Sequence, residues 1–126
     1  MAKQEIHTNH APLAIGPYSQ AIGVGNTVYL SGQIPLDPDT MTLVSENITD
    51  QVTQVFKNIQ TVSKAAKGNL DNIVKLTIYL LDLNHFAIVN DVMSQFFNKP
   101  YPARTTIQIS ALPKAAKIEI DAILVL

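Results

Sequence analysis

Hydrophobic residues recur along the chain with two periods, which predict helices in some segments and strands in others. Residues 47–67 carry apolar side chains every three or four positions, which is typical of a helix that buries one face. Asn47 suits the N-cap, Lys64 and Lys67 suit the negative end of the helix dipole, and Gly68 is a stop signal. The apolar stripe comprises Ile48, Val52, Val55, Phe56, Ile59, Val62 and Ala66.

A second helix is predicted from Asn84 to Phe97. Asn90 lies four residues after Phe86 and three before Met93, so it borders the apolar stripe of this helix. A structural hydrogen bond would explain a polar residue in that place, and a binding role is the alternative. The side chains expected to point inward are Phe86, Val89, Met93, Phe96 and Phe97.

Alternation of apolar and polar residues predicts the strands. Residues 18–33 are expected to form two strands around a Gly25-Asn26 hairpin turn, and further strands are expected at 73–81, 104–109 and 117–126. This order predicts a single domain over residues 1–126, a two-layer α+β fold with both helices on one face of a mixed sheet. The residues expected to meet the helices are Val28, Leu30, Val74, Leu76, Ile78, Leu80, Ile107, Ile109, Ile118, Ile120, Ala122 and Leu124.

The same alternation assigns a set of polar residues to the other face of the sheet. This face would be richer in hydroxyl and amide groups than in lysine and glutamate, and it would have Ile123 and Val125 at one end. We therefore expect another subunit to cover it and leave a sheltered polar cleft; an ordinary solvated face is the alternative. The set comprises Tyr29, Ser31, Gln33, Thr77, Tyr79, Arg104, Thr106, Gln108, Glu119 and Asp121.

Arg104 and two acidic residues carry the candidate chemistry of that face. Arg104 is the only arginine among nine basic residues, and its planar fork of donors matches a carboxylate or phosphate. It could hold an anionic ligand or make a structural salt bridge. Glu119 and Asp121 lie two apart on one strand, so their proximity should raise one pKa. Such a set can bind a small carboxylate and position a water for hydrolysis or proton transfer.

Composition narrows the possible functions. Hydrophobic residues make up 47% and charged residues 15% of the chain, which indicates buried surface beyond one protomer and hence an oligomer. The net charge of −1 gives no basic footprint for nucleic acid. There is no cysteine, and the three histidines do not suggest a metal site or a Ser-His-Asp triad. With no apolar leader or membrane-spanning run, we expect a soluble cytoplasmic protein.

Six motifs together give the chain a resemblance to the RidA (YjgF) family of imine deaminases, over nearly its whole length. Many family members carry cysteine where Thr106 stands, and a Thr-Gly turn where this chain has Thr40-Met41. The motifs are Ile15-Gly-Pro-Tyr-Ser-Gln20, Leu30-Ser-Gly-Gln-Ile-Pro35, Asp82-Leu-Asn-His-Phe-Ala-Ile-Val-Asn90, Phe96-Phe97, Tyr101-Pro-Ala-Arg104 and Lys117-Ile-Glu-Ile-Asp-Ala122.

The resemblance implies a homotrimer of chorismate-mutase-like domains, whose sheets form a central barrel with active sites between subunits. It implies hydrolysis of 2-iminobutanoate and 2-iminopropanoate, or their enamine tautomers, to 2-keto acids and ammonia, which protects pyridoxal-phosphate enzymes, without cofactor or metal. Arg104 would clamp the substrate carboxylate, Glu119 would orient or activate water, and the backbone of Thr106 would meet the imine nitrogen. Tyr18 would close the pocket across the subunit boundary. The residues that would line or support it are Ser31, Gly32 and Asn90.

Family members have also been linked to RNA cleavage, translation inhibition and chaperone-like holding. The charge and the residues of the expected cleft make a nuclease a poor fit. A chaperone-like or translation-modulating protein that binds a small ligand without turnover stays an alternative, because exposed apolar surface cannot be counted from the sequence.

Overall fold

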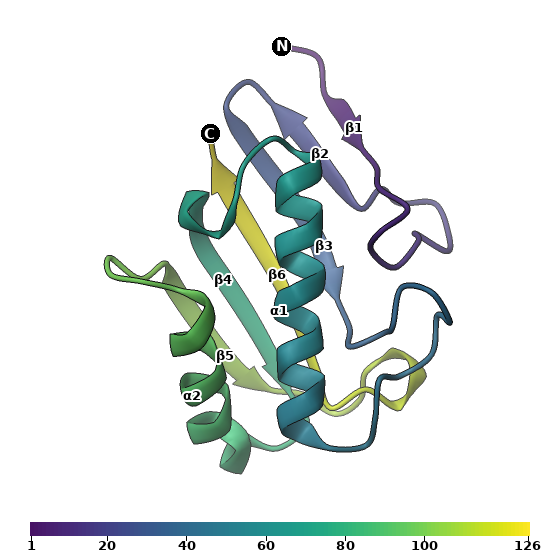
Figure 1. The fold of residues 1–126 in the computed structure, drawn as a ribbon, viewed down its shortest axis with the longest axis vertical. Coiled ribbons are helices and arrows are strands. Elements are labelled where there is room, and N and C mark those ends of the chain that lie inside the picture. Colours follow the sequence, from purple (N-terminus) through teal and green to yellow (C-terminus); the bar gives the residue numbers. More distant parts are fainter.

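Six strands form one sheet in the order β1-β2-β3-β6-β4-β5, with two helices on one of its faces (Figure 1). The computed structural model describes all residues from 1 to 126. Strands β4 and β5 pair in parallel and the other neighbours pair antiparallel, so the sheet is mixed. The elements are β1 (Gln4–Ile6), β2 (Ala21–Val24), β3 (Thr27–Gln33), α1 (Ile48–Ala65), β4 (Ile73–Leu80), α2 (Phe86–Phe96), β5 (Ala103–Gln108) and β6 (Ile118–Val125).

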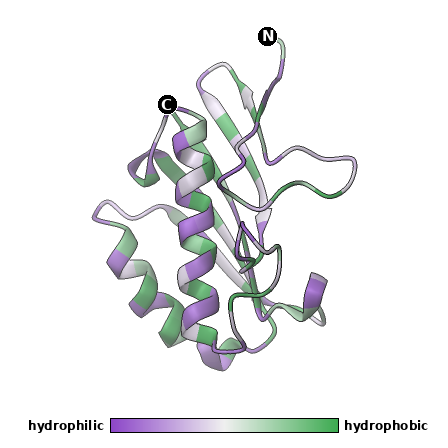
Figure 2. Cartoon of the chain, turned by 45° about the vertical axis from the view of Figure 1, so that its right-hand side comes forward, coloured by the Kyte–Doolittle hydropathy of each residue, from purple (hydrophilic) through white to green (hydrophobic).

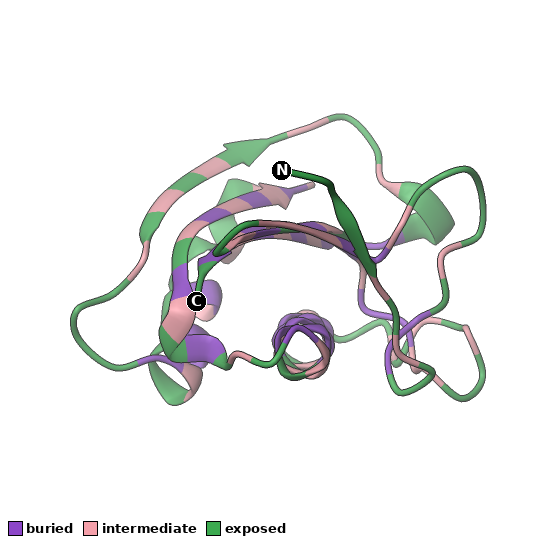
Figure 3. Ribbon diagram, turned by 90° about the horizontal axis from the view of Figure 1, so that it is seen from above, coloured by how far each residue is buried: buried purple, intermediate pink, exposed green.

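The predicted two-layer α+β fold is confirmed. Seen from above, the sheet arches over α1, which lies in its concave side (Figure 3). Strand β1 was not predicted, because its three residues are mostly exposed and show no apolar alternation. No helix is long and apolar enough to cross a membrane.

Helix α1 follows its apolar pattern closely. The side chain of Asn47 accepts a hydrogen bond from the backbone N–H of Asp50 at 3.1 Å, which caps the first turn as predicted. Hydrophobic and hydrophilic residues occupy different sides of this helix (Figure 2). At its C-terminal end, Lys67 rather than Gly68 takes the left-handed conformation, with φ of 67°. The predicted glycine stop is therefore displaced by one residue.

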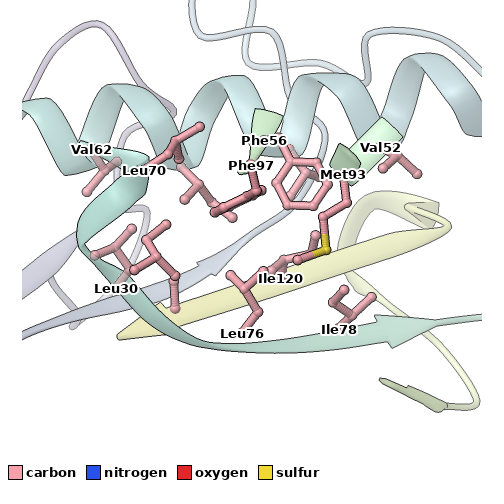
Figure 4. Close-up of a cluster of buried hydrophobic side chains, with 14 of the residues drawn as sticks. Leu30, Val52, Phe56, Val62, Leu70, Leu76, Ile78, Met93, Phe97 and Ile120 are labelled. Carbon is pink, nitrogen blue, oxygen red and sulfur yellow. The ribbon is translucent and has the colours of Figure 1, made fainter. Parts of the chain in front are cut away.

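The core lies between the helices and the sheet (Figure 4). Phe56 on α1 is fully buried, and its ring centroid lies 5.5 Å from that of Phe96 and 5.6 Å from that of Phe97. These aromatic contacts join α1 to the C-terminal end of α2. The two helices are thereby fixed side by side on the sheet.

Two irregularities in the sheet overturn predicted side-chain directions. The register shifts between Leu30 and Gln33, so that Gln33 lies opposite Ile120 and is only 5% exposed on the helix side. A second shift between Ile73 and Lys75 leaves Val74 46% exposed, whereas it was predicted to be in the core. Each shift changes which side chains face the helices.

The side chains of strand β5 also lie on the opposite sides of the sheet from those predicted. In the parallel register, Arg104 lies beside Leu76 and Thr106 beside Ile78, both of which are buried under the helices. Gln108 follows the same register beside Leu80, whereas Ile107 lies on the open face and is 41% exposed. As the last strand of the sheet, β5 is polar or exposed on both sides, so its alternation could not identify the covered one.

The turn before α1 keeps a left-handed residue although it lacks glycine. Met41 has φ of 60°, and its backbone N–H donates to the carbonyl of Asp37 at 2.8 Å. A non-glycine residue in this conformation costs about 1 kcal/mol. The Thr40-Met41 turn therefore contains a left-handed residue without using glycine.

Removal of the Asn47 cap tests the structural role of α1. Asn47→Ala should lower the free energy of unfolding by about 1 kcal/mol, because a backbone N–H of the first turn loses its acceptor. Urea denaturation at a fixed protein concentration measures the change. The control is Asn98→Ala, which replaces an exposed asparagine outside the helices. Equal losses in both variants would show that the cap contributes nothing specific.

Candidate functional site

Arg104 lies in a cleft between β5 and α2. Its Nη1 donates to Oδ1 of Asn90 at 2.7 Å and lies 3.6 Å from Sδ of Met93. The parallel connection β4-α2-β5 places the helix over the strand and so creates these contacts. We call this space, of about 360 Å³, the arginine cleft; it is lined by Asn90, Met93, Ser94, Tyr101, Pro102 and Arg104.

The charge of Arg104 is not neutralised by these partners. Both of its hydrogen bonds within the chain leave from Nη1, toward an amide oxygen and a thioether sulfur. The edge formed by Nη2 and Nε keeps donors for a ligand, and a planar carboxylate matches that edge. Asn90 thus makes a hydrogen bond within the chain, one of the two roles considered for it, and its partner is the candidate anion-binding residue.

Glu119 lies in a different cleft, on strand β6. This space, which we call the glutamate cleft, has a volume of about 400 Å³ and is lined by Tyr18, Gly32, Lys114 and Glu119 among others. A Cβ atom at position 32 would lie 2.5 Å from Oε2 of Glu119. A glycine at this position in the bulge of β3 therefore makes room for the carboxylate.

The loop that carries Tyr18 is tied to β3 through Ser31. The Ser31 hydroxyl donates to the carbonyl of Ser19, and the Ser31 backbone N–H donates to the carbonyl of Gln20 at 3.0 Å. Tyr18 is half exposed, and its hydroxyl accepts from the backbone N–H of Ile15 at 3.3 Å. Ser31 thus supports the glutamate cleft, whereas Tyr18 and Gly32 line it.

The paired carboxylates have the predicted effect on one pKa. Partial burial raises the pKa of the Glu119 carboxyl, and the negative charge of Asp121 raises it further. Asp121 accepts a hydrogen bond from the Tyr79 hydroxyl at 3.0 Å, on the open face of the sheet. Burial is the larger cause, whereas the sequence pointed only to the neighbouring charge.

The two clefts do not meet in one chain. Arg104 shares the helix side with Leu76, whereas Glu119 lies beside Tyr79 on the open side, and strand β4 separates their strands. Neighbouring strands are about 4.8 Å apart, so the two residues lie on opposite faces and two strand spacings from each other. The predicted common cleft on the far face is therefore wrong for Arg104 and Thr106. Thr106 lies on the helix side, where its hydroxyl is buried without a partner.

Phe86 is a neighbour of Arg104 that the sequence did not reveal. It was predicted to point into the core, but it is 41% exposed, and its ring centroid lies 4.9 Å from Cζ of Arg104. Phe86, Asn90 and Met93 follow one another at helical spacing on one side of α2. The polar residue inside this apolar stripe was the available signal that the stripe faces something other than the core.

The described residues contain no group of three or more His, Asp or Glu side chains that could hold a metal ion. Within the arginine cleft the side chains offer one guanidinium, an amide and hydroxyl groups, which suit an anionic organic ligand. The chemistry available across the two clefts is carboxylate binding on one side and proton transfer by a carboxyl group on the other.

Known proteins are similar to this chain over nearly its whole length. Residues 8–126 match the family described as Endoribonuclease L-PSP. A RutC family protein of Pyrococcus abyssi is 47% identical over 98% of this chain and 97% of its own. The chain belongs to the RidA (YjgF) family. A RidA relative from Homo sapiens named 2-iminobutanoate/2-iminopropanoate deaminase is 44% identical, over 98% of this chain and 90% of its own.

Solved structures of the RidA family share the fold. RidA of the Antarctic bacterium Psychrobacter sp. PAMC 21119 superimposes with a TM-score of 0.95 at 48% identity, over 98% of this chain and 99% of its own. TdcF of E. coli, solved with bound serine, has a TM-score of 0.92 at 40% identity, over 98% of both chains. The expected RidA-type fold is confirmed.

The raised pKa of Glu119 predicts a pH-dependent gain in stability for Glu119→Gln. The folded state holds the Glu119 proton more tightly than the unfolded chain, so ionisation of this group disfavours the folded state. The variant should therefore gain stability over the parent as pH rises above the usual glutamate pKa of 4.5, as measured by urea denaturation. Glu46→Gln, which removes an exposed carboxyl, is the control and should show a smaller change. A gain for Glu119→Gln that is independent of pH would refute the raised pKa.

Proposed function

We propose that this protein hydrolyses small reactive 2-imino acids, such as 2-iminobutanoate and 2-iminopropanoate and their enamine tautomers, to 2-keto acids and ammonia. In doing so it would protect pyridoxal-phosphate enzymes from these intermediates. The observation that carries the proposal is Arg104, whose charge faces a cleft while its partner is a neutral amide. Relatives from Dermatophagoides farinae and Homo sapiens, at 45% and 44% identity, bear the name of this activity.

Arg104 is proposed to hold the carboxylate of the substrate. Its Nη2 and Nε donors can form two parallel hydrogen bonds with a carboxylate, which fixes both the position and the plane of the ligand. Asn90 holds the other side of the guanidinium through Nη1. The adjacent backbone of Thr106 is proposed to contact the imine nitrogen.

Glu119 is proposed to activate the attacking water. Burial and the charge of Asp121 raise its pKa, which makes the carboxylate a better base than an ordinary glutamate. Water oxygen bonds to the imine carbon as Glu119 takes a proton. That proton then goes to the nitrogen, the carbon–nitrogen bond breaks and ammonia leaves, while Glu119 takes the remaining hydroxyl proton as the carbonyl forms. Protonated imines already react with water, so placement of the two reactants can supply much of the acceleration.

The separation of the two clefts supports a site shared between subunits. In the proposed homotrimer, the arginine cleft of one protomer faces the glutamate cleft of the next, and Tyr18 closes the pocket across this boundary. Apolar side chains exposed on the open face of the sheet support burial against another copy. They are Tyr29, Val74, Ile107 and Val125.

Loss of the guanidinium tests the carboxylate clamp. Arg104→Ala should lower kcat/KM by about a hundredfold or more, because two charge-assisted hydrogen bonds are lost. A threonine dehydratase supplies the imine, and keto acid release above the rate of solvent hydrolysis is measured. Arg104→Lys should fall between parent and Arg104→Ala, and Lys99→Ala, which removes an exposed cation, should resemble the parent. Parental turnover in Arg104→Ala would remove this residue from the mechanism and favour binding without turnover.

The pH dependence of turnover tests the role of Glu119. Protonation of the base should lower kcat/KM on the acid side, with a midpoint above the usual glutamate pKa of 4.5, because burial and Asp121 raise it. Asp121→Asn removes one of the two causes, so its acid limb should move to lower pH. If Glu119→Gln shows the same fall in kcat/KM on the acid side as the parent, the titrating group is not Glu119.

A further inference from the structure

Helix α2 constrains the Arg104 guanidinium in two independent ways. The ring of Phe86 lies against it, with 4.9 Å between Cζ and the ring centroid. Asn90, one helical turn later, accepts from Nη1 at 2.7 Å. Side chains four apart on a helix lie on one side of it, so both contacts come from the same surface.

Core packing does not explain Phe86. It is 41% exposed and takes no part in the cluster of buried side chains. The other two phenylalanines of this region, Phe96 and Phe97, pack against Phe56. Phe86 is thus an exposed aromatic residue that contacts the candidate anion-binding group.

We propose that Phe86 is a positioning residue, which sets the plane of the Arg104 guanidinium so that its free edge meets the carboxylate of the substrate. This inference rests on the proposed function. An aromatic face attracts the cation without taking up its N–H donors, which lie in the guanidinium plane. A carboxylate in the place of Phe86 would also orient Arg104, but it would compete with the ligand for those donors and for the charge.

Together, Phe86 and Asn90 leave little freedom to a long side chain. The ring restricts the plane of the guanidinium, and the amide restricts rotation within that plane. Ordering an arginine on binding has an entropic cost, so prior ordering increases affinity for a planar anion. The consequence is a specific loss of carboxylate affinity when the ring is replaced by an aliphatic side chain.

Binding of 2-oxobutanoate, a product of the proposed reaction, separates this role from a structural one. Titration calorimetry on Phe86→Leu should show about three- to thirtyfold weaker binding than in the parent, whereas Phe86→Tyr should bind like the parent. Phe86→Met is a second replacement without a ring and should resemble Phe86→Leu. In turnover, the loss should appear mainly in KM, because the clamp acts on ground state and transition state alike. Phe96→Leu is the matched control: it should lower the thermal stability without weakening binding.

Three different results would overturn the inference. If Arg104→Ala loses binding while Phe86→Leu and Phe86→Met bind like the parent, Phe86 does not position the guanidinium and the proposed function stands. If Arg104→Ala itself binds 2-oxobutanoate like the parent, the carboxylate clamp fails and the role of Phe86 fails with it. In a double-mutant cycle, Phe86→Leu should weaken 2-oxobutanoate binding by a smaller factor in the Arg104→Lys background than in the parent. An equal loss of 2-oxobutanoate affinity in both backgrounds would also contradict the inference.

Discussion

The two faces of a β-sheet separate the only arginine of this chain from its paired carboxylates. Because β5 runs parallel to β4 through the crossover helix α2, Arg104 comes to lie under that helix. Glu119 occupies the central strand β6 and faces the other way, beside Tyr79. The proposed reaction, which uses both groups on one small substrate, would therefore require a second copy of the chain.

This separation gives each half of the proposed site a different environment. Arg104 is surrounded by an amide, a thioether and an aromatic ring, none of which carries a charge. Glu119 lies beside Asp121 in a partly buried setting that favours its protonated form. The first environment suits the binding of an anion and the second suits proton transfer.

The sequence predicted those elements whose patterns were long or sharply marked. Seven apolar positions and the Asn47 cap defined α1, and Gly25-Asn26 defined the hairpin of β2 and β3. Short or irregular features were not predictable in the same way. A bulge in β3 turns the side chain of Gln33 to the helix side of the sheet, opposite to the prediction. The edge strand β5 was too polar on both sides to show which side met the helices. The sequence named Arg104 and Glu119 as candidates, but their division between two clefts depends on register, which the pattern of β5 did not fix.

Mixing two inactive variants tests most directly whether the site is shared. Arg104→Ala and Glu119→Gln would be unfolded together, refolded and assayed for imine hydrolysis, with mixed assemblies verified by native mass spectrometry. About one junction in four would then pair an intact arginine with an intact glutamate, so the mixture should recover about a quarter of the parental activity. Mixed assemblies as inactive as either variant alone would contradict a site formed by Arg104 of one protomer and Glu119 of another.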